Sequence, residues 1–447
     1  MATLCGGFSV WKCSVGVWSR RVLFCGWAGL GGAAPSAARA AFLPGSPVVV
    51  DYVVHISVDG LRGDLLKQLL ASDPASYPSF QRLRAESSHT FNARCDYTIS
   101  ETVPNHVTMV TGRPVHRPAG QPTTIHHGYT NNSPPSTDVI HGFNVNVPYV
   151  ASVFDVVHDR GRSTALLLSK AKLALIERSY DVVHGAADLL PPDQGRDKIE
   201  FSQAADGDTG GLLTSLTGRL ASNPDAYTFM HLHQPDEAGH IYGWGSAPWN
   251  AAVAAVDVRL AQLFAAVDAR PALRGRLAIV LTADHGGGGG AASGHSDATR
   301  IENVTIPFFV WAPGFPPGAE IHTLLANRWD PGATRPDYNA ARQPLRNGDS
   351  GNLSLALLGL GPVPGSWLQP AFVSAQSGPE LHRVAGQLEV RWGVDFAGYV
   401  LETSAGLSPE SWQLIDQGIT AEEGVFKYLV PVESAPAARR FFRLRKP

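Results

Sequence analysis

The chain has 447 residues, a length that suits one large α/β domain with a smaller appendix rather than one small domain. Hydrophobic residues make up 44% and charged residues 17%, the proportions of a globular protein with a sizeable core. The formal net charge of -3 excludes the basic surface that duplex nucleic acid requires, and the sequence has no block of like charges suited to an anionic membrane surface.

The first 40 residues have the features of an export signal. Arg20 and Arg21 precede the apolar stretch VLFCGWAGLGGAA, and Ala38-Arg39-Ala40 has the small-x-small pattern of a cleavage site. The stretch is shorter than the ~20 apolar residues that span a bilayer, so no integral membrane span is expected there. An ordinary secretory signal and a twin-arginine signal both remain open, and either predicts an exported protein, periplasmic or extracellular.

From residue 46 onward, short apolar runs alternate with helical patterns. The helical patterns include residues 148–160 and a long stretch from about Pro248, where apolar residues recur at spacings of three and four. The runs predicted as strands are VVVDYVVHISV, TALLLS, AYTFMHLH, LAIVLTA and IPFFVWA. This alternation predicts an α/β/α sandwich with a mainly parallel central sheet over residues 41–376.

The sequence pattern changes after the segment GPVPGSWLQP at 361–370. Residues 377–447 contain short alternating runs such as LEVRWGV, GYVLETS and FKYLVPV, which predict a small antiparallel all-β domain. Its closing RFFRLRKP resembles small β-domains appended to bacterial exported proteins, so we expect an accessory role such as attachment to a surface or a glycan.

Polar residues with metal-binding chemistry follow several of the predicted strands. Chemistry in open α/β sheets gathers at the carboxyl ends of strands, and carboxylates with imidazoles form a ligand set for zinc. Taken singly, each of these residues has a structural explanation as a helix cap, a surface pair or a flexible loop, and only their joint occurrence indicates a site. The candidates are Asp59, Thr102, Asp236, His240, Asp284, His285 and His295.

The motifs around these residues resemble a known family. VDGLRGD, TVPNHVTMVTG, PDEAGH and the DHGG and GH elements resemble, in this order, the signatures of the type I phosphodiesterase/nucleotide pyrophosphatase branch of the alkaline-phosphatase superfamily, over about residues 50–360. The resemblance implies two zinc ions and hydrolysis of phosphodiesters or nucleotide pyrophosphates.

The resemblance also implies a role for each candidate. One zinc ion would be held by Asp236, His240 and His295. The other would be held by Asp59, Asp284, His285 and the oxygen of Thr102. His322 or His382 is the alternative to His295, because the third histidine of many relatives lies far beyond the Asp-His pair.

Thr102 is the expected nucleophile. A threonine hydroxyl is a poor nucleophile until a metal lowers its pKa, and the start of a helix favours an alkoxide and a phosphate. Attack would give a phosphothreonine intermediate. The segment HHGYTNN at 126–132 resembles the family's H-G-x-x-x-N element, whose Asn donates a hydrogen bond to a phosphate oxygen; this points to Asn132, with Asn131 as the neighbour to test and a plain polar turn as the other interpretation.

Structural hydrogen bonds, rather than general-base catalysis, are expected for three further histidines, His106, His231 and His233. Specificity is expected in the loops at 113–147 and 170–208.

Other functions remain as alternatives. A sulfatase needs a Cys or Ser in a C-x-P-x-R context, and Cys95 lies in CDYTI, which lacks both the Pro and the Arg. A phosphate monoesterase or a phosphonate hydrolase could use the same zinc pair and nucleophile. From a different class, a secreted binding protein with structural metals is possible in principle, but structural zinc sites normally have four protein ligands. The expected partner is a small-molecule phosphate ester.

Overall fold

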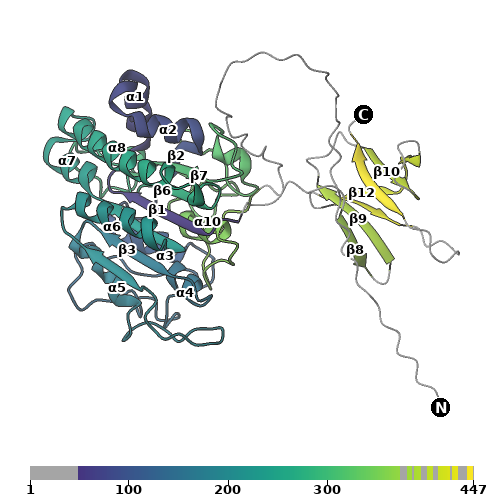
Figure 1. The fold of residues 1–447 in the computed structure, drawn as a ribbon, viewed down its shortest axis with the longest axis horizontal. Helices are drawn as coiled ribbons and strands as arrows, with labels where there is room; N and C mark the ends of the chain where they lie inside the picture. The colour runs from purple at the N-terminus through teal and green to yellow at the C-terminus, as the bar shows by residue number, and fades with distance from the viewer. Residues whose placement is uncertain are drawn as a thin grey trace. The chain divides into compact units, whose positions relative to one another are not determined.

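The computed structural model describes residues 49–372 without a gap and, after them, residues 380–384, 387–393, 400–405, 411–422, 425–430 and 440–445. The predicted export segment, residues 1–40, lies outside the described residues. Residues 49–372 fold around a twisted central sheet with helices against it (Figure 1).

The central sheet has seven strands in the order β2-β7-β6-β1-β5-β3-β4. The five strands from β6 to β4 are parallel, whereas β7 and β2 add an antiparallel edge. The prediction of a mainly parallel sheet is therefore confirmed, and β2 and β4 are strands that the sequence patterns did not reveal. The strands are β1 (Tyr52–Val58), β2 (Ser88–Arg94), β3 (Thr164–Leu168), β4 (Phe201–Ala204), β5 (Tyr227–Leu232), β6 (Leu277–Thr282) and β7 (Thr305–Trp311).

Two groups of helices flank this sheet. In one group α10 contacts α3, α4, β1 and β6, and in the other α8 contacts α2, α6 and α7. Four short 3-10 turns, η1 to η4, lie between the helices and strands. The helices are α1 (Gly63–Ser72), α2 (Pro78–Glu86), α3 (Thr102–Thr111), α4 (Val153–His158), α5 (Ala174–Ser179), α6 (Thr209–Ser222), α7 (Gln234–Tyr242), α8 (Ala247–Asp268), α9 (Ile301–Val304) and α10 (Asp349–Leu357).

The helix predicted over 148–160 is shorter in the structure, because a capping box starts it late. Ser152 is the N-cap of α4, and the Asp155 carboxylate accepts a hydrogen bond from the Ser152 backbone N–H at 2.8 Å. The helix ends at His158, and Gly161 takes a positive φ of 65° in the turn that follows.

Helix α8 confirms the long helix predicted from Pro248. Ser246 caps it by accepting from the Trp249 N–H, and its apolar positions, including Val253, Val256 and Leu260, are buried. By length and composition α8 is also the one helix among the described residues that could cross a membrane. Its buried stripe and its contacts with α2, α6 and α7 account for that apolar character as core packing.

The described parts of the C-terminal region form two small antiparallel sheets, as predicted. One has the order β11-β10-β14 and the other β12-β13-β9-β8. Val390, Trp392, Leu401 and Val430 are buried together between them. The strands are β8 (Glu380–Val384), β9 (Gln387–Gly393), β10 (Val400–Ser404), β11 (Gln413–Ile415), β12 (Ile419–Glu422), β13 (Val425–Leu429) and β14 (Phe441–Arg445).

Candidate metal centre

The adjacency of two parallel strands brings the first candidate residues together. Ser57 of β1 pairs in register with Thr282 of β6, so Asp59 and Asp284 leave the same edge of the sheet side by side. Gly60 closes the turn after Asp59 with φ 67°, and its N–H donates to Asp284 Oδ1 at 3.0 Å. A Cβ on Gly60 would lie 2.9 Å from Cβ of Asp236, so the glycine also permits the close approach of helix α7.

Asp59, Asp284 and His285 form a fully buried cluster, which we call the inner cluster. Their potential ligand atoms all lie within 4.8 Å of one another. His285 Nε2 is 3.4 Å from Asp59 Oδ1 and 3.3 Å from Asp284 Oδ2. None of the three side chains is exposed to solvent.

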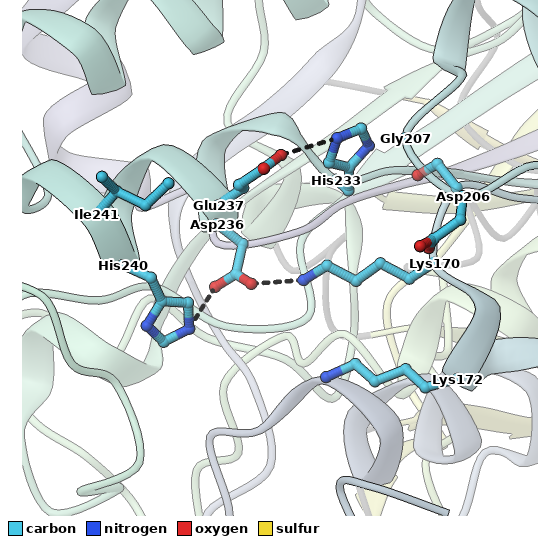
Figure 2. A pocket seen from close by; sticks show the side chains of 10 residues that line it. Lys170, Lys172, Asp206, Gly207, His233, Asp236, Glu237, His240 and Ile241 are labelled. Atoms are coloured by element: carbon cyan, nitrogen blue, oxygen red, sulfur yellow. Dashed lines mark hydrogen bonds and ion pairs between the residues drawn. The ribbon is translucent and has the colours of Figure 1, made fainter.

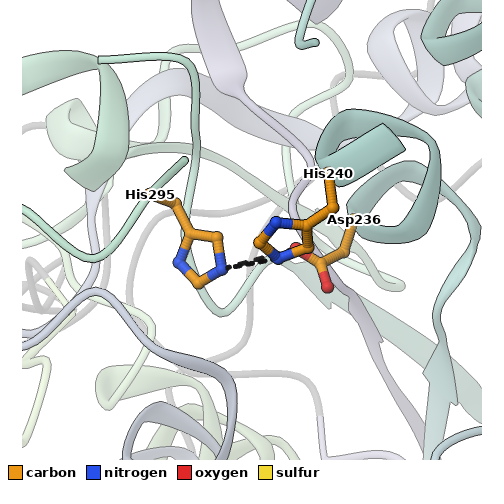
Figure 3. A group of neighbouring side chains, drawn as sticks. All are labelled: Asp236, His240 and His295. Carbon is orange, nitrogen blue, oxygen red and sulfur yellow. Dashed lines mark hydrogen bonds and ion pairs between the residues drawn. The ribbon is translucent and has the colours of Figure 1, made fainter. Parts of the chain in front are cut away.

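Asp236, His240 and His295 form a second cluster, which we call the outer cluster (Figure 3). Asp236 and His240 lie one turn apart on α7, and His295 lies in the glycine-rich loop after β6. The two imidazole Nε2 atoms are 3.1 Å apart, and Asp236 Oδ1 is 3.4 Å from His240 Nε2 and 3.7 Å from His295 Nε2.

Backbone carbonyls fix the orientation of all three imidazoles. Nδ1–H of His285 donates to Gly286 O at 2.8 Å, that of His295 to Ser100 O at 2.6 Å, and that of His240 to Ser293 O at 3.0 Å. A carbonyl can only accept, so in neutral rings each Nε2 presents a lone pair to the clusters. A hydrogen bond from the second ring nitrogen to a backbone carbonyl is the arrangement typical of metal-bound histidine.

In each of the three carboxylates, one oxygen bonds to protein donors and the other oxygen has no such partner. Asp59 Oδ2 lies 3.1 Å from His231 Nε2 and 2.7 Å from Lys170 Nζ, and Lys170 also reaches Asp236 Oδ2 at 2.5 Å. Asp284 Oδ1 accepts from the N–H groups of Gly60 and His285. The remaining atoms, Asp59 Oδ1, Asp236 Oδ1, Asp284 Oδ2 and His285 Nε2, are buried without a hydrogen-bond partner.

Such orphaned acceptors are costly unless a cation binds them, so the donor set fits metal ions. The two facing Nε2 lone pairs of His240 and His295 likewise repel each other unless a cation or proton lies between them.

The electrostatics of the clusters also favour cations. The pKa of Asp284 lies well above its usual range because of burial and the nearby Asp59 carboxylate. Burial opposes the charged form of His285 as well, but the carboxylates, Asp284 first, outweigh it and raise the pKa of His285 to about 9. In the outer cluster, burial and the neighbouring His285 lower the pKa of His295 to about 3, which keeps that ring neutral and able to ligate.

Thr102 begins helix α3, as the sequence predicts, and is buried. The side-chain oxygen of Asn132 accepts from the next backbone N–H, that of Val103, at 3.0 Å and from Lys172 Nζ at 3.2 Å. With Oδ1 occupied by two donors, the amide Nδ2 of Asn132 remains as a donor beside the start of α3. Asn131 instead accepts from the Ser133 N–H within a turn, so of the two neighbours Asn132 is the one that bonds to the first turn of α3, next to Thr102.

The remaining histidines have structural partners. His106 donates from Nδ1 to the Thr102 carbonyl at 2.7 Å and accepts at Nε2 from Ser57 Oγ, which ties α3 to β1. His231 Nε2 meets Asp59 Oδ2, and its Nδ1 accepts from Ser169 Oγ. His233 pairs with Glu237 on the adjoining helix.

Of the two alternatives to His295, His322 lies outside both clusters, on η4 (Ile321–Leu324), where it pairs with Glu320. His382 belongs to β8, and its side chain lies outside the described part of the chain.

Two residues at the centre were not predicted from the sequence. Lys170 follows β3 at the same edge of the sheet, and the strand-end rule that selected Asp59 could have selected it as well. Trp244 donates its indole N–H to Gly60 O at 2.8 Å, and its ring lies close to His240 and His295. A Cβ at Gly239 or at Gly287 would collide with that ring, so Trp244 holds helix α7 and the glycine-rich loop together. Nothing in the sequence pattern marks it.

One further acidic group has metal-ligand chemistry but already holds a cation. His158, Asp159 and Asp188 surround the buried ammonium of Lys198, which bonds to Asp188 and to Gly195 O. Because a protein cation occupies it, this group is explained as an internal ion pair.

Comparison with protein families supports the assignment made from the motifs. A family model described as Type I phosphodiesterase / nucleotide pyrophosphatase matches residues 53–298, more than half of the chain. No curated protein matches the sequence.

Among solved structures, murine ectonucleotide pyrophosphatase / phosphodiesterase 5, in an inactive form with AMP, is 13% identical, with 70% of this chain and 96% of that chain covered and a TM-score of 0.47. Phosphonoacetate hydrolase from Sinorhizobium meliloti 1021 with phosphonoacetate is 18% identical, with 55% and 60% covered and a TM-score of 0.35.

Proposed function

Because the chain belongs to the type I phosphodiesterase/nucleotide pyrophosphatase family, we propose that it hydrolyses phosphodiesters or nucleotide pyrophosphates with two zinc ions and through a phosphothreonine on Thr102. Metal-dependent hydrolysis of phosphoesters follows from the family itself. The identity and number of the ions, the nucleophile and the preference for diesters are the proposal.

The single observation that carries the proposal is the set of buried acceptor atoms without donors. Asp59, Asp236 and Asp284 each turn one oxygen inward, and the imidazole Nε2 atoms face the same space. Each cluster offers three nitrogen or oxygen ligands and no thiolate, which is the ligand number of a catalytic zinc site with room for substrate. We assign one ion to each cluster, with Thr102 as an additional ligand of the inner one.

Zinc ions bound there would supply the positive charge that lowers the pKa of a nearby hydroxyl and offsets charge on the phosphoryl group. The Thr102 oxygen attacks phosphorus, a P–O bond to Thr102 forms, and the bond to the leaving oxygen breaks. Water then cleaves the phosphothreonine and restores the hydroxyl. Asn132 Nδ2 donates to a phosphoryl oxygen, together with the Thr102 backbone N–H at the start of α3.

Surrounding residues hold this machinery in place. The hydrogen bond from His106 Nδ1 to the Thr102 carbonyl fixes the first turn of α3 against β1. Lys170 binds Oδ2 of Asp59 and Oδ2 of Asp236, so the Oδ1 atom of each carboxylate stays directed at the clusters.

The test combines metal content with a nucleophile variant. Protein purified without chelator should contain about two zinc ions per chain by elemental analysis. Thr102→Ala should keep the zinc yet lower turnover of a chromogenic phosphodiester by at least about 10³-fold, while Thr102→Ser retains part of it. Thr214→Ala on the exposed face of α6 is the matched control.

Two results would contradict the proposal. Metal-free protein with full activity would exclude the zinc pair, and near-normal turnover by Thr102→Ala would mean that water attacks directly. Comparison of bis-aryl phosphate, aryl monophosphate, phosphonate and nucleotide substrates separates the diesterase from the monoesterase and the phosphonate hydrolase. We also propose export of the chain, which amino-terminal sequencing of secreted or periplasmic protein would check.

A further inference from the structure

Ser100 is a fully buried serine that precedes Thr102 by two residues and belongs to neither cluster. It exchanges two hydrogen bonds with His295 of the outer cluster. The Ser100 hydroxyl donates to the His295 carbonyl, and Nδ1–H of His295 donates to the Ser100 carbonyl at 2.6 Å. This reciprocal pair joins the segment that carries the proposed nucleophile to the loop that carries a ligand candidate, although 195 positions separate the two residues in sequence.

The backbone on either side of Ser100 is held by helix α3. Asn105 Nδ2 donates to the carbonyls of Ile99 and Glu101, at 2.9 and 3.0 Å. Glu101 has an extended backbone, with φ -123° and ψ 152°. The carbonyl between these two, that of Ser100, accepts from His295 instead. A short segment therefore bonds to its own helix through two peptides and to the outer cluster through the peptide between them.

His295 is a buried residue in an exposed part of the glycine-rich loop, where its neighbours Ser293 and Ser296 face solvent. Its ring stacks on the ring of His285, with 3.7 Å between centroids and 10° between planes. Stacking fixes the plane of the ring but not the direction of Nε2 within that plane. The hydrogen bond from Nδ1–H to the Ser100 carbonyl supplies this direction, and the Ser100 hydroxyl holds the loop backbone at the same residue.

The other two members of the outer cluster have different surroundings. Lys170 pairs with Asp236, and both Asp236 and His240 line a cavity of about 460 Å³ (Figure 2). His295 is not among the described residues that line this cavity. Within the outer cluster, His295 is therefore the member that connects to the nucleophile segment, and Ser100 is its partner there.

We propose that Ser100 is a positioning residue, which directs the His295 imidazole at the outer cluster and couples binding of the outer metal ion to the placement of Thr102. A cation at Nε2 makes Nδ1–H a stronger donor and so tightens its bond to the Ser100 carbonyl. Coupling between two sites is reciprocal, so a firmly held Ser100 also raises the affinity for that ion. This inference rests on the proposed function and adds the residue that links its outer metal site to its nucleophile.

The first test measures metal affinity and turnover. Ser100→Ala removes the hydroxyl and leaves the buried His295 carbonyl without that donor. In a competition with a chelator, we expect about 10-fold weaker binding of one zinc ion and less than about 2-fold weaker binding of the other, as for residues that orient metal ligands. The value of kcat should fall about 10-fold with KM within about 3-fold, because the contacts of Asn132 are unchanged. Ser100→Thr keeps the hydroxyl and should restore most of both losses.

Ser354→Ala is the matched control. It deletes another buried serine hydroxyl that donates to a carbonyl, that of Ser350 at 2.8 Å, on α10 outside both clusters. This variant should change neither the zinc affinities nor kcat. Equal weakening of both ions by Ser100→Ala, or no weakening of either ion, would overturn the inference.

Measurements that do not depend on turnover separate failure of this inference from failure of the proposed function. In zinc-free protein with nitrogen-15-labelled histidine, Nδ1–H of His295 should give a slowly exchanging magnetic resonance signal, identified by its loss in His295→Ala. Ser100→Ala should speed its exchange with water at least about 10-fold. In the Thr102→Ala protein, adding Ser100→Ala should still weaken one zinc ion about 10-fold.

If the wild-type protein hydrolyses no phosphoester, the proposed function falls, and the exchange and zinc measurements alone decide the role of Ser100. An exchange rate of the His295 Nδ1–H that Ser100→Ala leaves unchanged would overturn that role.

Discussion

The inner and outer clusters use the same chemistry on different supports. Asp59 and Asp284 follow adjacent parallel strands, and every side chain of the inner cluster is fully buried. The outer cluster joins helix α7 to a glycine-rich loop, and the side chain of His240 is 47% exposed. Sheet pairing places Asp59 and Asp284 of the inner cluster side by side, whereas the residues of the outer cluster meet only because a helix packs against a loop.

This difference explains why the ring of Trp244 packs directly against ligand candidates of the outer cluster, whereas it reaches the inner cluster only through the backbone of Gly60. Its ring lies against Gly239 of α7 and Gly287 of the loop, where any side chain would collide with it. It also contacts the rings of His240 and His295 edge-on, at 5.5 and 5.8 Å between centroids. The outer cluster is therefore held by one side chain that supports two separate segments.

The largest loss of zinc and turnover is expected from removing a negative charge from the inner cluster. Asp284→Asn keeps the shape of the side chain but removes the carboxylate that the buried Nε2 of His285 faces. We expect zinc content to fall to one ion or fewer and turnover to fall by at least about 10³-fold. Elemental analysis and single-turnover hydrolysis are the measurements, with Asp208→Asn at the exposed start of α6 as the control. Full zinc content in Asp284→Asn would show that the inner cluster is not a metal site.

A change in the outer cluster should remove one ion and leave the other. His295→Ala deletes a ring whose Nε2 lies 3.1 Å from His240 Nε2, and we expect one zinc ion per chain and about a 10²-fold or greater loss of turnover. His322→Ala should change neither the zinc content nor the turnover, because the His322 imidazole bonds to Glu320 at η4, outside both clusters. The reverse pattern would mean that the glycine-rich segment is only a loop.

The two clusters also show what the sequence could reveal. Strand runs such as LAIVLTA predicted β6, and the rule that chemistry follows strand ends selected Asp59 and Asp284, which lie together in the structure. Asp236 and His240 come one turn apart on α7, as their spacing of four predicts.

Partners across long sequence separations could not be predicted in this way. Lys170 meets Asp59 and Asp236, and Trp244 meets Gly60, through packing that a hydrophobic pattern does not encode. Period and polarity predict which residues are buried, but they do not predict which residues touch. The sequence also did not predict that β7 is antiparallel to β6, because an apolar run has the same pattern in a parallel and in an antiparallel strand.

A smaller change tests the difference by weakening mainly the support of the outer cluster. Trp244→Phe loses the hydrogen bond to Gly60 O and part of the ring that packs against α7 and the loop. We expect about 10-fold weaker binding of the zinc ion at the outer cluster and a smaller weakening at the inner cluster, which Trp244 reaches through Gly60 O, as for the loss of residues that orient metal ligands. Competition with a chelator measures both affinities. Trp311→Phe is the control, since its indole bonds to Glu86 instead, and equal weakening of both ions would refute the separate support.

The smallest effect on turnover is expected from removing the C-terminal β-region. The continuously described part of the chain around the centre extends to Phe372, which pairs with Leu325 in a β-bridge and contacts Phe315 at 5.5 Å between ring centroids. All candidate ligands, Thr102 and Asn132 precede that point, and the strands after it have a buried cluster of their own. A chain that ends near residue 376 should keep its zinc and its turnover within about twofold, because few contacts cross a domain boundary.

Turnover must be counted per folded molecule, since cutting the chain can expose an apolar face and cause aggregation without changing either cluster. Soluble, zinc-loaded protein that has lost turnover would show that the β-region completes the active site. The site would then depend on the β-region as well as on the sheet edge and on the packing of α7 against the glycine-rich loop. Retained turnover with lost attachment to cells or polymers would assign the β-region to localisation. Both clusters would then be properties of the central sheet and its two helical groups alone.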